Sequence, residues 1–237
     1  MSFLRIERNP PVRLVKLDTG KRNVLTLEAV EALGDSISAD SEAPVVILSG
    51  RIDGFCAGLD NASLAKGKAE REALLAGMAE LLLAAIVGPT RIVIACEGHA
   101  VAAGAMLLLV ADVRIGAHGS YKTGFTEPRL GMPLPELPAL LARERLDRRR
   151  LHELTVLGRT VDPEEAASVG FLDRLVATED LHATALNSAL EIAQLSDDAY
   201  RGTVASVWGP TVERIRELVD EQIRRRDAAR VGGRAPL

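Results

Sequence analysis

The fold is decided by residues 91–111, RIVIACEGHAVAAGAMLLLVA, where a β-branched run passes through a glycine turn into a longer apolar run. Arg91–Cys96 predicts a buried strand, Glu97-Gly98 a turn, and Ala102–Ala111 a buried helix. The same order appears earlier, where the strand predicted for Pro44–Ser49 leads into a glycine-containing loop, Gly50–Gly58. Strands that alternate with helices predict an α/β fold with mostly parallel pairing.

The N-terminal segment predicts a hairpin followed by a helix. Phe3–Arg8 and Val12–Leu17 alternate with the two-residue period of half-buried strands, and Asn9-Pro10-Pro11 supplies the turn between them. Thr26 is a suitable N-cap for a helix that we expect to run to about Ala39.

The second half of the chain is predicted to turn from strands to helices. Short strands are expected at Asp112–Ile115 and Ser120–Lys122, and a loop rich in Gly and Pro at Gly124–Pro138. Helices are expected from Ala139 onward. Gly209-Pro210 predicts a break before a last charged helix, Val212–Ala229.

Size and composition exclude several classes of protein. The chain has 237 residues, of which 47% are hydrophobic, so it can bury a full core, and its net charge of −4 argues against nucleic-acid binding. The longest apolar run, Val101–Ala111, is shorter than the roughly 20 residues that cross a bilayer. The start of the chain resembles neither a signal nor a transit peptide, so a cytoplasmic protein is expected.

Two rarer residue types suggest no special chemistry. Cys56 and Cys96 each lie in an apolar stretch and are interpreted as buried thiols. The four histidines lack paired metal-ligand spacing, so no metal site is expected.

Backbone groups are the strongest candidates for chemistry, because no G-x-G-x-x-G, P-loop or G-x-S-x-G motif occurs. Phe55–Asp60 places Gly58 just before a predicted helix, where free N–H groups point outward. Gly98–Ala105 repeats this arrangement near Ala103. Two such donors that converge on one oxygen would stabilise an oxyanion. The alternative, that these small residues only permit tight strand-to-helix packing, stays open.

The order of these segments resembles the crotonase superfamily of enoyl-CoA hydratases and isomerases, from about residue 3 to 195. The resemblance implies an α/β crotonase-like spiral of ββα turns, with residues 1–177 as an acyl-CoA-binding core and residues 178–237 as a helical C-terminal trimerisation region. The matching blocks are Lys21–Leu25, Val46–Gly50, Phe55–Asp60, Gly98–Gly104, Ala111–Ile115 and Gly124–Gly131.

The resemblance also implies a substrate, an assembly and site residues. The substrate would be an acyl-CoA thioester, no separate cofactor would be needed, and a homotrimer or hexamer would form. The oxyanion donors would be the N–H groups of Leu59 and Ala103. The walls of the acyl pocket would come from residues 62–85 and the C-terminal helices. The CoA moiety would be held by Lys21, Ala57, Gly58, Leu59 and Asp60.

Departures from the family pattern favour an isomerase. The usual glycine triplet is Ala102-Ala103-Gly104 here, and Met106 occupies the position of the first hydratase glutamate. Glu127 occupies the second, in a loop that resembles that of single-glutamate isomerases. Moving a double bond needs one proton shuttle, whereas adding water more naturally uses two acids.

Other functions remain open at this stage. A hydratase using Glu136 as a second acid is one alternative, although Glu136 is more typical of a helix start. A non-catalytic acyl-CoA binder is another, and Glu127 would then be an exposed loop acid. Asp60 is expected to cap a helix, and Asp112 to have a structural place.

Overall fold

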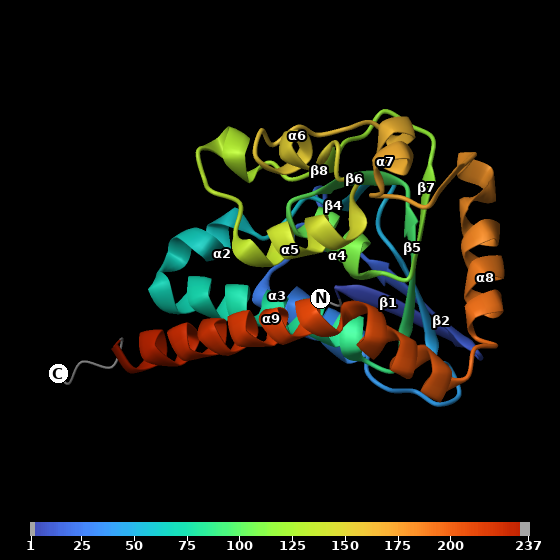
Figure 1. Ribbon diagram of the computed structural model, residues 1–237, viewed down its shortest axis with the longest axis horizontal. Coiled ribbons are helices and arrows are strands. Elements are labelled where there is room, and N and C mark those ends of the chain that lie inside the picture. Colours follow the sequence, from blue (N-terminus) through green and yellow to red (C-terminus); the bar gives the residue numbers. More distant parts are fainter. Residues whose placement is uncertain (1–2, 233–237) are drawn as a thin grey trace.

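The computed structural model describes residues 3–232 and contains two sheets (Figure 1). The larger sheet has the strand order β1-β2-β3-β5-β7-β9, and the smaller has the order β4-β6-β8. All neighbours pair in parallel except β1 and β2. The strands are β1 Leu4–Asn9, β2 Val12–Leu17, β3 Val45–Ser49, β4 Asp53–Cys56, β5 Arg91–Cys96, β6 Gly98–Val101, β7 Val113–Ala117, β8 Thr123–Gly124 and β9 Arg174–Val176.

The N-terminal predictions are confirmed. β1 and β2 form an antiparallel hairpin in which Leu4 pairs with Leu17. The Thr26 side chain accepts a hydrogen bond from the Ala29 N–H and caps the first helix, which ends at Ser36, slightly before the expected end.

The rest of the core repeats one unit of two strands and a helical segment. The first strand of each unit joins the larger sheet, the second joins the smaller sheet, and the helical segment returns the chain. β3-β4, β5-β6 and β7-β8 are the three strand pairs. The helical segments are α1 Leu27–Ser36, α2 Asn61–Lys66, α3 Lys68–Val87, α4 Ala103–Val110, η1 Glu127–Leu130, α5 Glu136–Arg145, α6 Leu151–Thr155, α7 Pro163–Val169, η2 Thr178–Asp180, α8 Leu181–Ile192 and α9 Asp197–Gly232.

The smaller sheet was not predicted. Residues 53–56 were expected in a loop, and no strand was expected between the turn at Glu97-Gly98 and the helix from Ala102, yet Cys56 pairs with Ala100, which pairs with Thr123. The strand expected at Ser120–Lys122 is wrong, because the paired residues are those of β8. Such short strands carry too little periodicity to be recognised, and pairing with distant neighbours defines them. The three-residue β9 was missed for the same reason.

Both faces of the larger sheet are covered, as parallel sheets require. Alternate residues point to opposite faces: Val45 and Ile47 pack toward α8, while Val46 and Leu48 face the main core. α8 lies along one side of the sheet in Figure 1, and α9 runs beside α3 on the other.

The predicted break at Gly209-Pro210 is wrong, because α9 continues through Pro210. Proline costs a helix interior about 3 kcal/mol, and tertiary contacts on both sides offset this cost. Before Pro210, Trp208 lies under the Arg145 guanidinium at 5.1 Å. After it, Ile215 and Val219 are buried in the core.

Several smaller expectations can also be compared with the structure. The Asp112 carboxylate accepts hydrogen bonds from the Ile92 N–H and the Tyr200 hydroxyl, which confirms its structural place. Burial raises the pKa of the Cys56 and Cys96 thiols to about 12, as expected for plain buried thiols. No helix between residues 3 and 232 has the length and apolar character needed to traverse a membrane.

The division at residue 177 stays a prediction. α8 and α9 both pack against the preceding core. Residues 1–2 and 233–237 of the two predicted segments lie outside the described part of the chain.

Candidate active site

The first candidate donor lies on the loop between β4 and α2. Leu25 donates its N–H to the Gly58 carbonyl and accepts from the Asp60 N–H through its own carbonyl, at 2.9 Å in each case. Within residues 3–232 the Leu59 N–H, which lies between these two bonds, has no protein acceptor. Asp60 caps α2 by accepting from the Ser63 N–H at 2.8 Å, as expected. The loop is therefore fixed while one donor stays available.

The second candidate donor lies where β6 enters α4. Ala102 has φ 51° and ψ −116°, a region that glycine prefers and that costs other residues about 1–3 kcal/mol. Its N–H donates to the Gly124 carbonyl at 3.0 Å, which holds the turn in place. Ala103 then begins α4, and no acceptor for its N–H is found in the described chain. A strained, anchored turn thus presents the predicted donor.

The two donor loops adjoin. A β-carbon placed on Gly58 would lie 3.0 Å from the Ala102 β-carbon and 3.7 Å from the Ala103 nitrogen. A β-carbon on Gly104 would collide with the Cys56 carbonyl oxygen. Glycine is needed at both positions because the backbones approach closely, and Gly58 also has φ 100°. These glycines therefore do permit tight packing, and the two N–H groups remain available beside it.

Glu127 opens the short helix η1, three residues beyond the end of β8. Its Oε2 is buried and has no hydrogen-bond partner among residues 3–232. Burial raises the pKa of this carboxyl group, although the backbone N–H groups of Glu127 and Thr126 oppose the shift. A carboxylate whose proton affinity is raised is a better base near neutral pH than an ordinary one. Glu127 is thus not a simple exposed loop acid.

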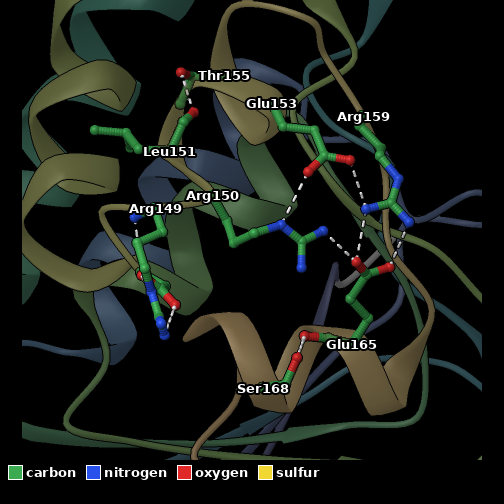
Figure 2. A network of polar contacts seen from close by, with 9 residues as sticks. Arg149, Arg150, Leu151, Glu153, Thr155, Arg159, Glu165 and Ser168 are labelled. Carbon is green, nitrogen blue, oxygen red and sulfur yellow. Dashed lines mark hydrogen bonds and ion pairs between the residues drawn. The ribbon is translucent and has the colours of Figure 1, made fainter.

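Figure 2 shows a cluster of four charged side chains, those of Arg150, Glu153, Arg159 and Glu165. Arg159 donates to Glu165 through both terminal nitrogens, at 2.6 and 2.8 Å, and to Glu153 at 2.7 Å. Arg150 bridges the same two acids from the other side. The cluster ties α6 to α7 and fixes the segment between them.

That segment supports the Glu127 loop. Thr123 and Val161 exchange both of their backbone hydrogen bonds, at 2.9 Å each. Arg129 donates from Nε to the Gly158 carbonyl at 2.8 Å. Contacts therefore hold the chain on both sides of Glu127. Sequence patterns do not identify Arg150 and Arg159 as supports, because their ion pairs with Glu153 and Glu165 form only when α6 and α7 pack together.

An apolar cavity of about 110 Å³ lies next to the first donor loop. Met106, at the position of the absent hydratase glutamate, lines it together with Leu59. The walls come from the regions that were expected to form an acyl pocket, α3 and the C-terminal helix, with the start of α5. The remaining lining residues are Leu75, Met78, Ala79, Leu82, Pro135, Glu136, Leu137, Pro138, Leu218 and Gln222.

Glu136 is confirmed as a helix-start carboxylate. It opens α5, and its two oxygens accept from Nε and Nη2 of Arg214 at 2.7 and 2.8 Å. This pairing lowers its pKa, so the group is held in its ionised form. It lines the cavity but is poorly suited to deliver a proton.

The segment predicted to hold CoA lies against the first donor loop. Ala57 donates its N–H to the Arg22 carbonyl at 3.1 Å, next to the exposed Lys21. The buried Asn23 side chain, for which no role was predicted, donates to the carbonyls of Gly54 and Phe55. CoA binding by Lys21 and residues 57–60 stays a prediction, as do the roles of Leu59, Ala103 and Glu127. No group of three potential metal ligands occurs in residues 3–232.

Known proteins resemble the chain over most of its length. The family model for enoyl-CoA hydratase/isomerase matches residues 7–220. A probable enoyl-CoA hydratase of Mycobacterium tuberculosis is 31% identical, with 83% of this chain and 74% of the relative covered. The mitochondrial enoyl-CoA delta isomerase 1 of Homo sapiens is 28% identical, with 88% and 68% covered.

Solved structures agree with this result. Human mitochondrial delta3-delta2-enoyl-CoA isomerase superposes with a TM-score of 0.89 at 26% identity, over 95% of this chain and 90% of that chain. An enoyl-CoA hydratase from Mycobacterium ulcerans gives 0.88 at 28% identity, over 94% and 99%. The expected α/β spiral is confirmed, and the relatives carry the names of both reactions. The chain therefore belongs to the enoyl-CoA hydratase/isomerase family of the crotonase superfamily.

Proposed function

We propose that this protein is an enoyl-CoA isomerase that converts a 3-enoyl-CoA to the trans-2-enoyl-CoA. The observation that carries the proposal is the buried carboxylate of Glu127, whose Oε2 has no hydrogen-bond partner in the described chain, combined with apolar Met106 at the other acidic position of hydratases. One base that removes and returns a proton is sufficient for moving a double bond.

The reaction follows from the two donors and the one acid. The N–H groups of Leu59 and Ala103 donate to the thioester carbonyl oxygen and stabilise the negative charge that develops there. Glu127 takes a proton from C2, the electrons delocalise into a dienolate, and the same carboxyl group returns the proton to C4. Each preorganised donor contributes about 3 kcal/mol to such a transition state. The double bond thereby moves from C3–C4 to C2–C3 without other reactants.

Binding of the CoA moiety is assigned to Lys21 and the 57–60 loop, and the acyl chain to the apolar cavity. The hydrogen bond from the Ala57 N–H to the Arg22 carbonyl brings the segment around Lys21 next to the 57–60 loop, which supports this assignment. A homotrimer or hexamer is proposed on the family resemblance, and a cytoplasmic location is proposed from the sequence.

The hydratase is the second candidate, because relatives of similar identity carry that name. Among the described residues that line the cavity, Glu136 is the only one with a carboxylate. Arg214 already binds both oxygens of this carboxylate. This pairing disfavours a two-acid addition of water.

The deciding experiment compares two reactions of the purified protein side by side. The rate of isomerisation of 3-enoyl-CoA esters should exceed the rate of hydration of trans-2-enoyl-CoA esters by at least about tenfold. Such a factor corresponds to a difference of roughly 1.4 kcal/mol in activation free energy. Fast hydration with negligible isomerisation would establish the hydratase. Tight acyl-CoA binding with neither reaction would indicate a non-catalytic binder.

A further inference from the structure

One polar side chain in the wall of the apolar cavity has a buried oxygen without a hydrogen-bond partner among residues 3–232. α9 contributes Leu218 and Gln222 to this wall, one helical turn apart. Gln222 Oε1 is buried, and no hydrogen-bond donor contacts it within residues 3–232. An acceptor that is buried without a partner reduces stability, so such groups are usually satisfied by water or by a ligand.

The neighbouring groups do not satisfy this amide. Glu136 is the other polar side chain in the wall, and its carboxylate, which Arg214 keeps ionised, has no proton to donate to the amide oxygen. A water bound there would be displaced by the acyl chain that the proposed function places in the cavity, which leaves the acceptor open to a donor on that chain. The remaining lining side chains are apolar. The missing partner is therefore expected to belong to the molecule that fills the cavity.

The chemistry of the amide indicates which group that is. A glutamine amide presents an acceptor oxygen and a donor nitrogen, which exchange places when the last torsion turns over. A hydroxyl pairs with either atom because it both donates and accepts. A methyl or methylene group pairs with neither.

We propose that the acyl chain of the substrate carries a hydroxyl near its distal end and that Gln222 selects for it. This inference rests on the proposed function, which places the acyl chain in the cavity next to Leu59. The walls of the cavity of about 110 Å³ are apolar except for Gln222 and Glu136, so they suit an acyl chain that carries one polar group.

The test uses pairs of substrates that differ by one terminal hydroxyl, 3-hexenoyl-CoA and 6-hydroxy-3-hexenoyl-CoA, with matched pairs from the pentenoyl to the octenoyl chain. The wild-type protein should prefer the hydroxylated member of its best pair by about five- to tenfold in kcat/KM, mainly through KM, since one buried hydrogen bond is worth about that factor. Gln222→Met should abolish the preference, measured as the ratio of kcat/KM for the two members of each pair. Gln222→Leu provides a second variant should the first fail to fold.

The control is Gln194→Met, at the chain's other glutamine, which is exposed after α8. It should leave the preference unchanged. The inference is overturned if the wild type shows no preference in any pair, or if both Gln222 variants retain the preference. If the proposed function is wrong, neither ester of any pair is isomerised. Calorimetric titration with the saturated esters then still tests the inference. It reports whether the hydroxylated member binds more tightly and whether Gln222→Met removes the difference in affinity.

Discussion

Glu127 and Glu165 lie on neighbouring segments, yet their carboxylates have opposite surroundings. Burial alone would raise the pKa of Glu165, but hydrogen bonds from Arg150 and Arg159 bring it below its ordinary value. Glu127 has no such cation, and its pKa is raised. A paired carboxylate holds its proton weakly and fixes its neighbours, whereas an unpaired one stays able to exchange a proton. The same residue type thus supports the fold in one place and is available for reaction in the other.

The largest expected effect comes from replacing the unpaired acid. Glu127→Gln keeps the shape of the side chain but removes the base, so kcat for isomerisation should fall by about 10²–10⁴-fold. Affinity for a saturated acyl-CoA, measured by calorimetry, should change little. If Glu165→Gln lost as much activity as Glu127→Gln, the distinction between the two carboxylates would be wrong.

The next effect concerns the donors that would act with Glu127. In Gly58→Ala the new methyl group would lie 3.0 Å from the Ala102 β-carbon at φ 100°, so the two donor loops must move apart. Loss of one aligned donor should reduce kcat by about 10²-fold. Thermal unfolding of the same preparation should show a folded protein. Unchanged kinetics would exclude the Leu59 and Ala103 N–H groups as the oxyanion donors.

Replacing the paired acid should chiefly affect stability. Glu165→Gln removes one centre of the four-residue charge cluster, and partly exposed ion pairs contribute up to about 1 kcal/mol. The midpoint of thermal unfolding should fall by about 2–4 °C, with kcat reduced by less than about tenfold. The exposed pair of Asp147 and Arg149 offers a control, since Asp147→Asn breaks a contact outside the cluster.

The smallest effect is a change in pH dependence. Because the folded-state pKa of Glu127 is raised, the native protein binds more protons than the unfolded chain above the unfolded-state pKa of about 4.3. Stability therefore falls as pH rises through the raised pKa. Glu127→Gln removes this penalty, so the variant should unfold at a slightly higher temperature than the wild type at neutral pH. The difference should vanish below pH ~4, where both states are protonated. A constant difference at every pH would contradict an unpaired Glu127.

Much of the fold could be predicted because its strands and helices carry strong local patterns. The hairpin, the Thr26 cap and the strands β3 and β5 follow from periodicity and capping. The two-residue β8 could not be predicted, because its pairing with Ala100 and Val161 exists only in the folded chain. The break predicted at Pro210 is wrong for a related reason. Proline does destabilise the helix locally, but the burial of α9 outweighs this loss of stability.

In the candidate site, too, some features could be predicted from local sequence and others could not. The two glycine-containing loops and Glu127 could be identified from the order of motifs. The unpaired state of Glu127 depends on burial, and the availability of Gln222 depends on where α9 crosses the cavity. No local pattern distinguishes Gln222 from any other polar residue on a charged helix.

The exchange of hydrogen bonds between Thr123 and Val161 has a consequence for recombination between relatives. Residues 121–129 and 158–165 are far enough apart in the sequence to be inherited or engineered separately, but hydrogen bonds join them around Glu127. A crossover placed between them would join a Glu127 loop to a foreign support. Chimeras within the family should therefore carry residues 121–165 as a single block, with their boundaries before Tyr121 and after Glu165.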